Sequence, residues 1–283
     1  MRRWRRLVYG LATVMAPLLG LRPRGFFIPY GRAASIAAAG TNRYPAIAKL
    51  LAEREGDFRQ TLDAIHRHGA ALAAIGDEPP PSPRWNQDWF SGLDAAAAYS
   101  LVRERRPGRI VEVGSGHSTR FMARAIADGG LPTVLTAIDP RPRAALAGLK
   151  LEALRMTAQD ADESLFAALQ PGDMLFIDSS HVLMPGSDVD FLFNRILPRL
   201  QPGTLAHVHD IFLPDDYPAD WAWRGYNEQN VVAALLQGGA WRPLFASHYV
   251  STRMTSEAAR PELALLPIPP TARPSSLWLI KQS

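Results

Sequence analysis

Cysteine is absent from this sequence of 283 residues. Its absence excludes a disulfide framework and any metal site built on thiolates, although it does not distinguish one cellular compartment from another. Acidic residues are absent from residues 1–32, which contain seven arginines. The whole chain has a formal net charge of +4, so subtracting these seven positive charges leaves −3 for residues 33–283. A mildly acidic body lacks the positive charge on which nucleic-acid binding depends, and we expect no nucleic-acid partner.

The first segment also lacks an apolar run long enough to cross a membrane. Its uncharged run, Leu7 to Leu21, has 15 residues and is interrupted by Pro17, whereas a span needs roughly 20 residues. No small-x-small signal-peptidase site precedes Arg22. We therefore expect residues 1–32 to form a basic leader that lies on the cytoplasmic face of a membrane, in a protein that is otherwise cytoplasmic. A first helix that packs on the body is the alternative.

The rest of the chain divides at Pro107-Gly108. Helical spacing of apolar residues predicts a helical extension over 33–107, and residues 108–283 alternate between short β-rich runs and helices. This order predicts an α/β fold, a Rossmann-like doubly wound sheet of seven mostly parallel strands with an antiparallel C-terminal hairpin. The expected strands are 109–113, 133–139, 155–157, 174–178, 204–209, 245–250 and 277–281, with helices at 93–106, 118–127 and 143–150.

A glycine turn follows the first expected strand. Gly114 and Gly116 permit a sharp turn and a close approach to a ligand. Thr119 stands where the dinucleotide fingerprint requires a third glycine, so NAD is disfavoured. Glu112 would repel a pyrophosphate but can pair with a cationic ammonium group. Asp139 ends the next strand, where an acid can accept both hydroxyls of a ribose.

Together these residues resemble the signature of the class I S-adenosylmethionine-dependent methyltransferases. In that family the Glu-x-Gly-x-Gly loop holds the methionine part of the cofactor, and the acid after the second strand holds the ribose. The resemblance implies S-adenosyl-L-methionine as cofactor, with Asp160 near its adenine. The alternative is that the glycines only form a tight turn between strand and helix. The predicted cofactor-binding residues are Glu112, Gly114, Ser115, Gly116, Asp139 and Asp160.

Acids and histidines follow two later strands: Asp178 and His181 after one, His209 and Asp210 after the other. The carboxyl ends of parallel strands share one edge, so these side chains are expected to converge beside the cofactor. Oxygen and imidazole ligands suit a divalent cation that lowers the pKa of a substrate hydroxyl, with His181 as proton acceptor. For Asp178, contact with the cofactor is an interpretation of equal weight to metal binding. His207 is interpreted as a hydrogen-bonded core residue.

The arrangement Asp178-x-x-His181 followed by His209-Asp210 resembles metal-dependent small-molecule O-methyltransferases of the macrolide-sugar and cephalosporin type. In those enzymes the first acid and a later acidic pair hold magnesium, and the histidine is the base. His209 stands where the later pair has its first carboxylate, and neutral imidazole binds magnesium poorly, which leaves a softer metal or no metal. The resemblance implies catalytic roles for His181 and Asp178 and metal contacts from Asp178, His209 and Asp210.

An aromatic, proline-stiffened stretch over 211–228 follows the second acidic strand end. Such a loop predicts a lid over a small-molecule acceptor. The alternative is a surface loop whose rings pack on the body or on a second subunit of a homo-oligomer. The predicted substrate-contacting residues are Tyr217, Trp221, Trp223 and Tyr226.

These patterns predict an S-adenosylmethionine-dependent methyltransferase, a transferase that carries out O-methylation of a small organic molecule. A metal hydrolase that uses His207, His209 and Asp210 with Asp178 and His181 is one alternative. A membrane-tethered binding protein that keeps the fold without the chemistry is the other.

Overall fold

The computed structural model describes residues 3–21, 25–26, 28, 30–35, 43–76, 78–90, 92–259, 261–264 and 266–282. Two compact units divide the chain: Met1–Gly40 with Tyr217–Gly225, and Thr41–Asp216 with Tyr226–Ser283. In the part of the chain described here, no helix is both long and apolar enough to span a membrane. Part of the predicted leader, including Arg2, Arg22 and Arg24, lies outside the described residues. The first unit contains α1 (Arg3–Leu18) and the 3-10 turns η1 (Ala33–Ser35) and η5 (Ala219–Arg224).

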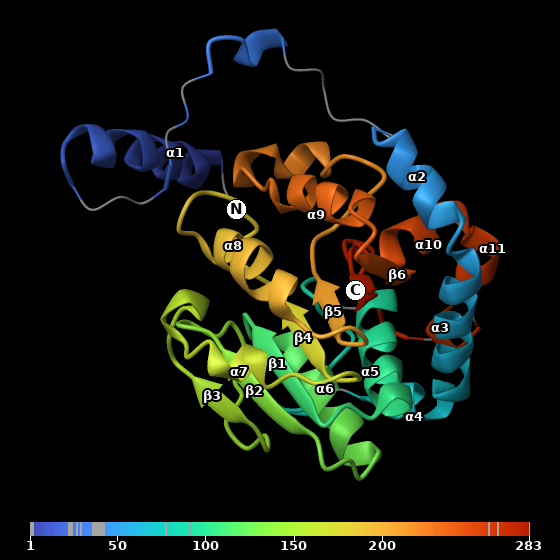
Figure 1. The fold of residues 1–283 in the computed structure, drawn as a ribbon. Helices are drawn as coiled ribbons and strands as arrows, with labels where there is room; N and C mark the ends of the chain where they lie inside the picture. Colours follow the sequence, from blue (N-terminus) through green and yellow to red (C-terminus); the bar gives the residue numbers. More distant parts are fainter. Residues whose placement is uncertain are drawn as a thin grey trace. The chain divides into compact units, whose positions relative to one another are not determined.

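A seven-stranded sheet forms the centre of the second unit (Figure 1). Its strand order is β3-β2-β1-β4-β5-β7-β6, with β1 to β5 parallel and β7 antiparallel to both of its neighbours. This architecture confirms the predicted doubly wound α/β fold with an antiparallel pair at its C-terminal end. The strands are β1 (Arg109–Val113), β2 (Val134–Ile138), β3 (Glu152–Leu154), β4 (Met174–Ile177), β5 (Leu205–Val208), β6 (Trp241–Ala246) and β7 (Leu277–Lys281).

The central strands read as nearly unbroken apolar runs because helices cover both faces of the sheet. All four residues of β4 and all four of β5 are buried. The Asp173 carboxylate fixes the start of β1 beside β4, since it accepts hydrogen bonds from the Arg109 N–H (2.8 Å) and the Gln170 N–H (2.9 Å). The opposite, carboxyl ends of these strands are thereby aligned at one edge.

The helices of the second unit that precede the sheet belong to the same hydrophobic core as the sheet itself. Figure 1 shows α3 and α5 side by side; α5 also packs on α6, and α3 on β6. Residues 93–102 of α5 are all buried, which explains why this helix has no polar face. The helices of this unit are α2 (Pro45–Ala52), α3 (Glu55–Arg67), α4 (Gly69–Ala73), α5 (Leu93–Arg105), α6 (His117–Asp128), α7 (Ser164–Ala167), α8 (Asp188–Phe191), α9 (Glu228–Gln237), α10 (Ser247–Arg253), α11 (Thr255–Ala258) and α12 (Pro261–Ala264). The unit also contains the 3-10 turns η2 (Ala158–Asp160) and η4 (Leu197–Arg199) and the π-helical segment η3 (Leu192–Ile196).

Three expected elements differ in the structure. Residues 143–150 form a loop instead of a helix, held down by the Arg120 guanidinium, which donates twice to the carbonyl of Ala145 (3.1 and 2.9 Å). The third strand lies at Glu152–Leu154, just before the expected 155–157. The sixth strand ends at Ala246, so most of the expected strand 245–250 belongs to α10. Tyr249 and Val250 favour strands intrinsically, but tertiary packing overrides such preferences.

Candidate active site

A pocket of about 520 Å³ opens at the carboxyl ends of β1, β2 and β4. Gly114, Asp139 and Asp178 contribute to its wall from the ends of these three strands, and residues 157–159 contribute from the segment after β3. Doubly wound sheets bind ligands where the strand order reverses, which is between β1 and β4 in this sheet. The volume lies within the range of about 300–1,000 Å³ that small-molecule sites occupy.

Gly114 allows the chain to turn at the base of the pocket. Its φ of +80° lies in the left-handed region, and an added Cβ would stand 2.0 Å from the backbone oxygen of Asp178. Gly114 is therefore required for the close approach of the turn after β1 to the end of β4. By contrast, the space around the Cα of Gly116 is open, which leaves room for a ligand to approach the backbone there.

Asp139 points into the pocket region from the end of β2. Its Oδ2 accepts hydrogen bonds from the Ser115 N–H (2.7 Å) and the Ser115 hydroxyl (3.1 Å), and its Oδ1 accepts one from the Arg141 N–H (2.6 Å). A carboxylate has about four acceptor positions. One position is therefore free for a further donor, and a second becomes free when the Ser115 hydroxyl rotates away.

Asp160 is near the pocket but is not part of its wall. Its exposed carboxylate accepts a hydrogen bond from the Thr157 hydroxyl (2.6 Å), whereas Thr157, Ala158 and Gln159 line the pocket. Residues 157–159, which directly precede Asp160, therefore border the pocket. They belong to the segment that the resemblance places near the adenine. The role of Asp160 itself stays a prediction.

Glu112 is fully buried and faces the first turn of α6. Its two carboxyl oxygens lie 2.6 Å from the hydroxyls of Ser118 and Thr119. Burial raises the pKa of Glu112 to about 8 despite these hydrogen bonds, so the side chain is protonated at neutral pH. The pocket wall does not include Glu112. The structure thus shows a neutral group that connects β1 to α6, and the expected pairing with a cofactor ammonium stays a prediction.

We expect Glu112→Gln to reduce the loss of stability at alkaline pH. The carboxyl pKa rises from 4.5 to about 8 on folding, so its contribution to the free energy of unfolding is complete below pH 4.5 and is lost as pH rises through 8. Glutamine cannot ionise and retains a donor and an acceptor for the two hydroxyls. The free energy of unfolding of Glu112→Gln, measured with urea from pH 5 to 9, should therefore decline less steeply with pH than that of wild type. The exposed control Glu53→Gln should behave as wild type does. Parallel declines in all three proteins would contradict this prediction.

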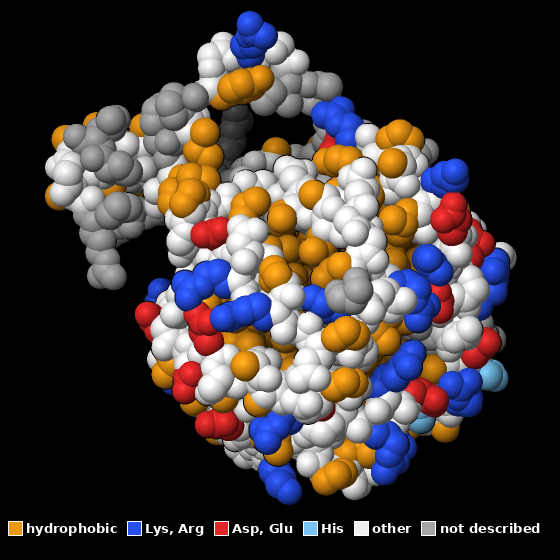
Figure 2. Space-filling view, viewed as in Figure 1, with side chains coloured by type: hydrophobic (Ala, Val, Ile, Leu, Met, Phe, Trp, Pro, Cys, Tyr) orange, Lys and Arg blue, Asp and Glu red, His pale blue; other side chains and the backbone are white. Residues whose placement is uncertain are grey.

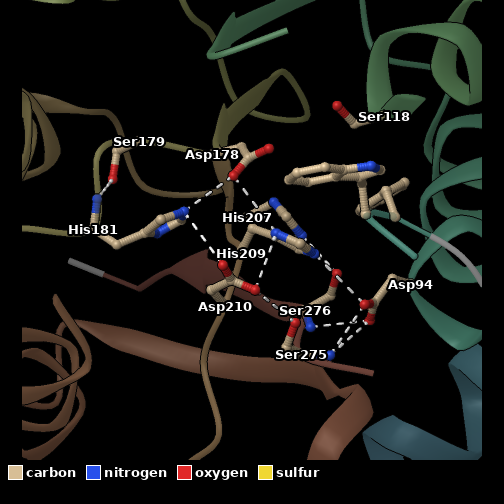
Figure 3. Close-up of polar contacts among 12 residues, drawn as sticks. Asp94, Ser118, Asp178, Ser179, His181, His207, His209, Asp210, Ser275 and Ser276 are labelled. Carbon is tan, nitrogen blue, oxygen red and sulfur yellow. Dashed lines mark hydrogen bonds and ion pairs between the residues drawn. The ribbon is translucent and has the colours of Figure 1, made fainter. Parts of the chain in front are cut away.

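Acids and imidazoles converge at the ends of β4 and β5, as the sequence predicts (Figure 3). His181 Nε2 lies 3.3 Å from Asp178 Oδ1 and 3.4 Å from Asp210 Oδ2. His209 Nδ1 lies 3.5 Å from the same Asp178 oxygen and 3.6 Å from Asp210 Oδ1. The two carboxylates are therefore held between two imidazoles.

These contacts shift the pKa values of His181, His209 and Asp178. Burial alone would lower the pKa of His181, but Asp178, Glu228 and Asp210 outweigh it and hold that pKa well above its usual value. The pKa of His209 is raised well above its usual value in the same way, against the effect of burial, by Asp210, Asp178 and Asp94. Burial would raise the pKa of Asp178, yet hydrogen bonds from the two imidazoles hold it well below its usual range. These directions favour the imidazolium forms of His181 and His209 and the carboxylate form of Asp178.

Asp178 is the most accessible member of this cluster. Its side chain is 27% exposed, compared with 2% for His181, 6% for His209 and 10% for Asp210. Asp178 also lines the pocket, and the other three residues do not. A molecule in the pocket can therefore touch Asp178, which in turn contacts His181 and His209.

Two acids that sequence reasoning missed support the cluster from behind. Glu228, the fully buried first residue of α9, places Oε2 2.8 Å from His181 Nδ1 and accepts a hydrogen bond from the Ser179 hydroxyl. Asp94, buried in α5, has Oδ2 3.6 Å from His209 Nε2 and accepts backbone hydrogen bonds from the segment before β7. The available signal was an acid at the start of an apolar helix, which also occurs at ordinary helix N-termini.

The described side chains do not fit the divalent cation that the sequence suggested. Among the residues described, no group of three or more His, Asp or Glu side chains is arranged to hold a metal ion. Asp178 and Asp210 instead face the ring nitrogens of His181 and His209. The predicted metal contacts of Asp178, His209 and Asp210 are thus not supported by the arrangement.

The predicted substrate-contacting residues fall in both units. The ring of Tyr226 lies 4.5 Å, centroid to centroid, from the ring of His181, beside the cluster. Tyr217, Trp221 and Trp223 belong to the first unit, where the Arg224 guanidinium stacks on the Trp221 ring at 3.7 Å. The lid and the homo-oligomer therefore remain predictions from the sequence.

Comparison with known families assigns a methyltransferase domain to residues 111–211. This stretch begins within β1 and ends after β5, and it includes the glycine turn, Asp139, and the acids and histidines at the ends of β4 and β5. The match confirms the predicted methyltransferase over this part of the chain. No curated protein matches the sequence.

Several solved structures are similar to the chain. A methyltransferase of Podospora anserina with bound S-adenosylhomocysteine is 14% identical, with 92% of this chain and 100% of that chain covered and a TM-score of 0.42. An O-methyltransferase of tomaymycin synthesis from Streptomyces achromogenes, in complex with S-adenosylmethionine, is 18% identical, with 78% and 90% covered and a TM-score of 0.42. An O-methyltransferase from Bacillus cereus with S-adenosylhomocysteine is 13% identical, with 79% and 91% covered and a TM-score of 0.38. Similarities this weak do not establish a shared substrate or ligand.

Proposed function

We propose that the protein transfers a methyl group from S-adenosylmethionine to a hydroxyl of a small organic acceptor. The observation that carries the proposal is the pocket at the reversal of strand order, with Asp139 at the end of β2 and Asp178 at the end of β4. A nucleoside that bears a cationic sulfur requires an acceptor for its ribose hydroxyls and tolerates a nearby carboxylate. The family match over residues 111–211 supports the same reaction class.

Different residues of the pocket would contact different parts of this cofactor. Asp139 would accept hydrogen bonds from the ribose, and residues 157–159 would border the adenine. The open backbone at Gly116 and the turn at Gly114 would lie beside the methionine part. When bound, S-adenosylmethionine supplies a methyl group on a positively charged sulfur, which needs only an aligned nucleophile.

Asp178 is the group placed to receive the proton of the acceptor hydroxyl. It is ionised, lines the pocket and is the most exposed member of the cluster. Methylation makes the acceptor oxygen strongly acidic, so a carboxylate is basic enough to take its proton as the new O–C bond forms and the S–C bond breaks. The sequence assigned this step to His181, but both ring nitrogens of His181 already face carboxylates. We therefore assign His181 a positioning role through Asp178.

The hydrolase alternative depends on His207, which the structure places in the core. His207 is fully buried, its Nε2 is 2.8 Å from the Ser276 hydroxyl, and its ring stacks on Phe176 at 3.7 Å. Burial holds the pKa of His207 well below its usual value. Because His207 is used for packing, the ligand set of the hydrolase alternative is incomplete, and methyl transfer is the function that we propose.

The proposal is tested by incubating the full chain with methyl-labelled S-adenosylmethionine and a panel of phenols, sugars and other hydroxyl compounds. We expect label in at least one organic product, with the same rate after treatment with a metal chelator. Binding of S-adenosylhomocysteine without transfer to any member of a broad panel would favour the inactive binding protein. Hydrolysis of substrates without a methyl donor would favour the hydrolase.

A further inference from the structure

Exposed apolar side chains are concentrated near the N-terminus. Among the described residues, Trp89 and Val134 are the large hydrophobic side chains that are exposed outside the first unit. Exposed apolar groups gathered in one segment mark an interaction surface, whereas single ones scattered over a protein need no explanation. The exposed large hydrophobic residues of the first unit are Trp4, Leu7, Val8, Leu11, Met15, Leu19, Leu21, Phe26, Ile28, Tyr30 and Trp223.

Five of these residues form one continuous face of α1, which we call the α1 apolar face: Trp4, Leu7, Val8, Leu11 and Met15. The positions i, i+3, i+4, i+7 and i+11 lie within a stripe of about 100° on a helix. Their exposed fractions run from 44% at Val8 and Met15 to 70% at Trp4. Figure 2 shows hydrophobic side chains, in orange, where α1 lies.

The opposite side of α1 has packing partners within its own unit. Ala16 is buried, and an added Cβ at Gly25 would stand 2.4 Å from a methyl carbon of Thr13, so the chain after α1 returns to this side. The N–H groups of Leu19 and Leu21 donate to carbonyls in the last turn of the helix. The helix therefore has a covered side and an uncovered apolar face.

The charge of residues 1–32 indicates the kind of partner that this face would bind. Residues 1–32 contain seven arginines and no acid, so the segment attracts negatively charged surfaces. A Trp and several arginines near one end of an amphipathic helix suit the headgroup layer of a bilayer, where rings and guanidinium groups reach polar atoms while aliphatic side chains enter the acyl region.

The length of α1 determines whether it can span a bilayer or lies on its surface. It has 16 residues, and a span needs roughly 20. We propose that α1 lies flat on the surface of a membrane that contains anionic lipids, with the α1 apolar face turned into the bilayer. This interaction surface is independent of the proposed methyl transfer, and it would keep the enzyme close to acceptors that partition into membranes.

Vesicle flotation of the full chain tests this proposal. We expect the protein to float with vesicles of phosphatidylcholine and phosphatidylglycerol, and binding to fall at least tenfold on pure phosphatidylcholine or in high salt. The variant Leu7→Ser/Leu11→Ser should lose at least tenfold in binding to the mixed vesicles. Val134→Ser removes a comparably exposed apolar side chain elsewhere and should bind as wild type does.

Two further measurements keep the outcome unambiguous. The midpoint of urea unfolding should be equal in the wild type and in Leu7→Ser/Leu11→Ser, which shows that the fold is intact whether or not methyl transfer is found. Arg5→Gln/Arg6→Gln should weaken binding to the mixed vesicles and reduce its salt dependence. Wild-type protein that fails to float, or a serine variant that floats equally well, would overturn the proposal. So would light scattering that shows a dimer lost in the serine variant without any vesicle binding.

Discussion

Replacing Asp178 with asparagine is expected to reduce methyl transfer by about 10²–10⁴-fold, the usual contribution of general base catalysis. Asparagine has nearly the same shape but cannot accept the hydroxyl proton, and it removes the negative charge shared by His181 and His209. The measurement is the rate of label transfer to the best acceptor from the panel at saturating cofactor. The affinity for S-adenosylhomocysteine, measured in parallel, should change much less than the rate.

Asp188→Asn is the matched control for this substitution. Asp188 lines the same pocket, but its carboxylate accepts hydrogen bonds from the N–H and hydroxyl of Ser180 and does not contact the imidazoles. Its replacement should leave the transfer rate close to that of wild type. If Asp178→Asn retained full activity while His181→Ala abolished it, the proton acceptor would be His181, as the sequence alone suggested.

Replacing Asp139 with asparagine is expected to weaken the binding of S-adenosylhomocysteine by about 10–100-fold. Hydrogen bonds to a charged group contribute about 1.5–3 kcal/mol, and each 1.4 kcal/mol corresponds to about a factor of ten in affinity. Isothermal titration calorimetry measures the change directly. Asp162→Asn is the control, because the exposed carboxylate of Asp162 is not part of the pocket wall, and the affinity of this variant should equal that of wild type.

A ligand that lacks the ribose hydroxyls distinguishes two causes of weaker binding: loss of the direct contact with Asp139 and a change in the turns that Asp139 holds. Asp139 also accepts hydrogen bonds from the N–H groups of Ser115 and Arg141, so its replacement could loosen the turns on both sides. The 2′,3′-dideoxy analogue of S-adenosylhomocysteine should bind wild type and Asp139→Asn equally if the carboxylate acts through the hydroxyls. A loss of the same size for both ligands would assign the effect to the turns.

The sequence predicted the elements that end at sharp local signals. The first strand was predicted at its observed bounds, Arg109–Val113, because an apolar run lies there between Pro107-Gly108 and the glycine turn. The expected helix at 143–150 did not form. Gly148 has a φ of +94°, which lies outside helical backbone, and the Arg120 side chain holds the loop through the Ala145 carbonyl.

The site was predictable where it depends on strand ends and was missed where it depends on helices. Asp178, His181, His209 and Asp210 converge because parallel strands share one edge. Glu228 lies 47 residues after His181 in the sequence, and no spacing rule relates a helix start to a strand end at that distance. The burial that makes Glu112 neutral likewise follows from how α6 covers β1, which cannot be inferred from the residue pattern.

A crystal structure of the full chain with S-adenosylhomocysteine tests most directly whether the pocket between β1 and β4 is the cofactor site. We predict the ribose hydroxyls at hydrogen-bond distance from the Asp139 carboxylate, the adenine beside residues 157–159, and the sulfur on the side of Asp178. An S-adenosylhomocysteine molecule bound elsewhere, or a dinucleotide retained in this pocket from the expression host, would contradict the proposed methyltransferase site.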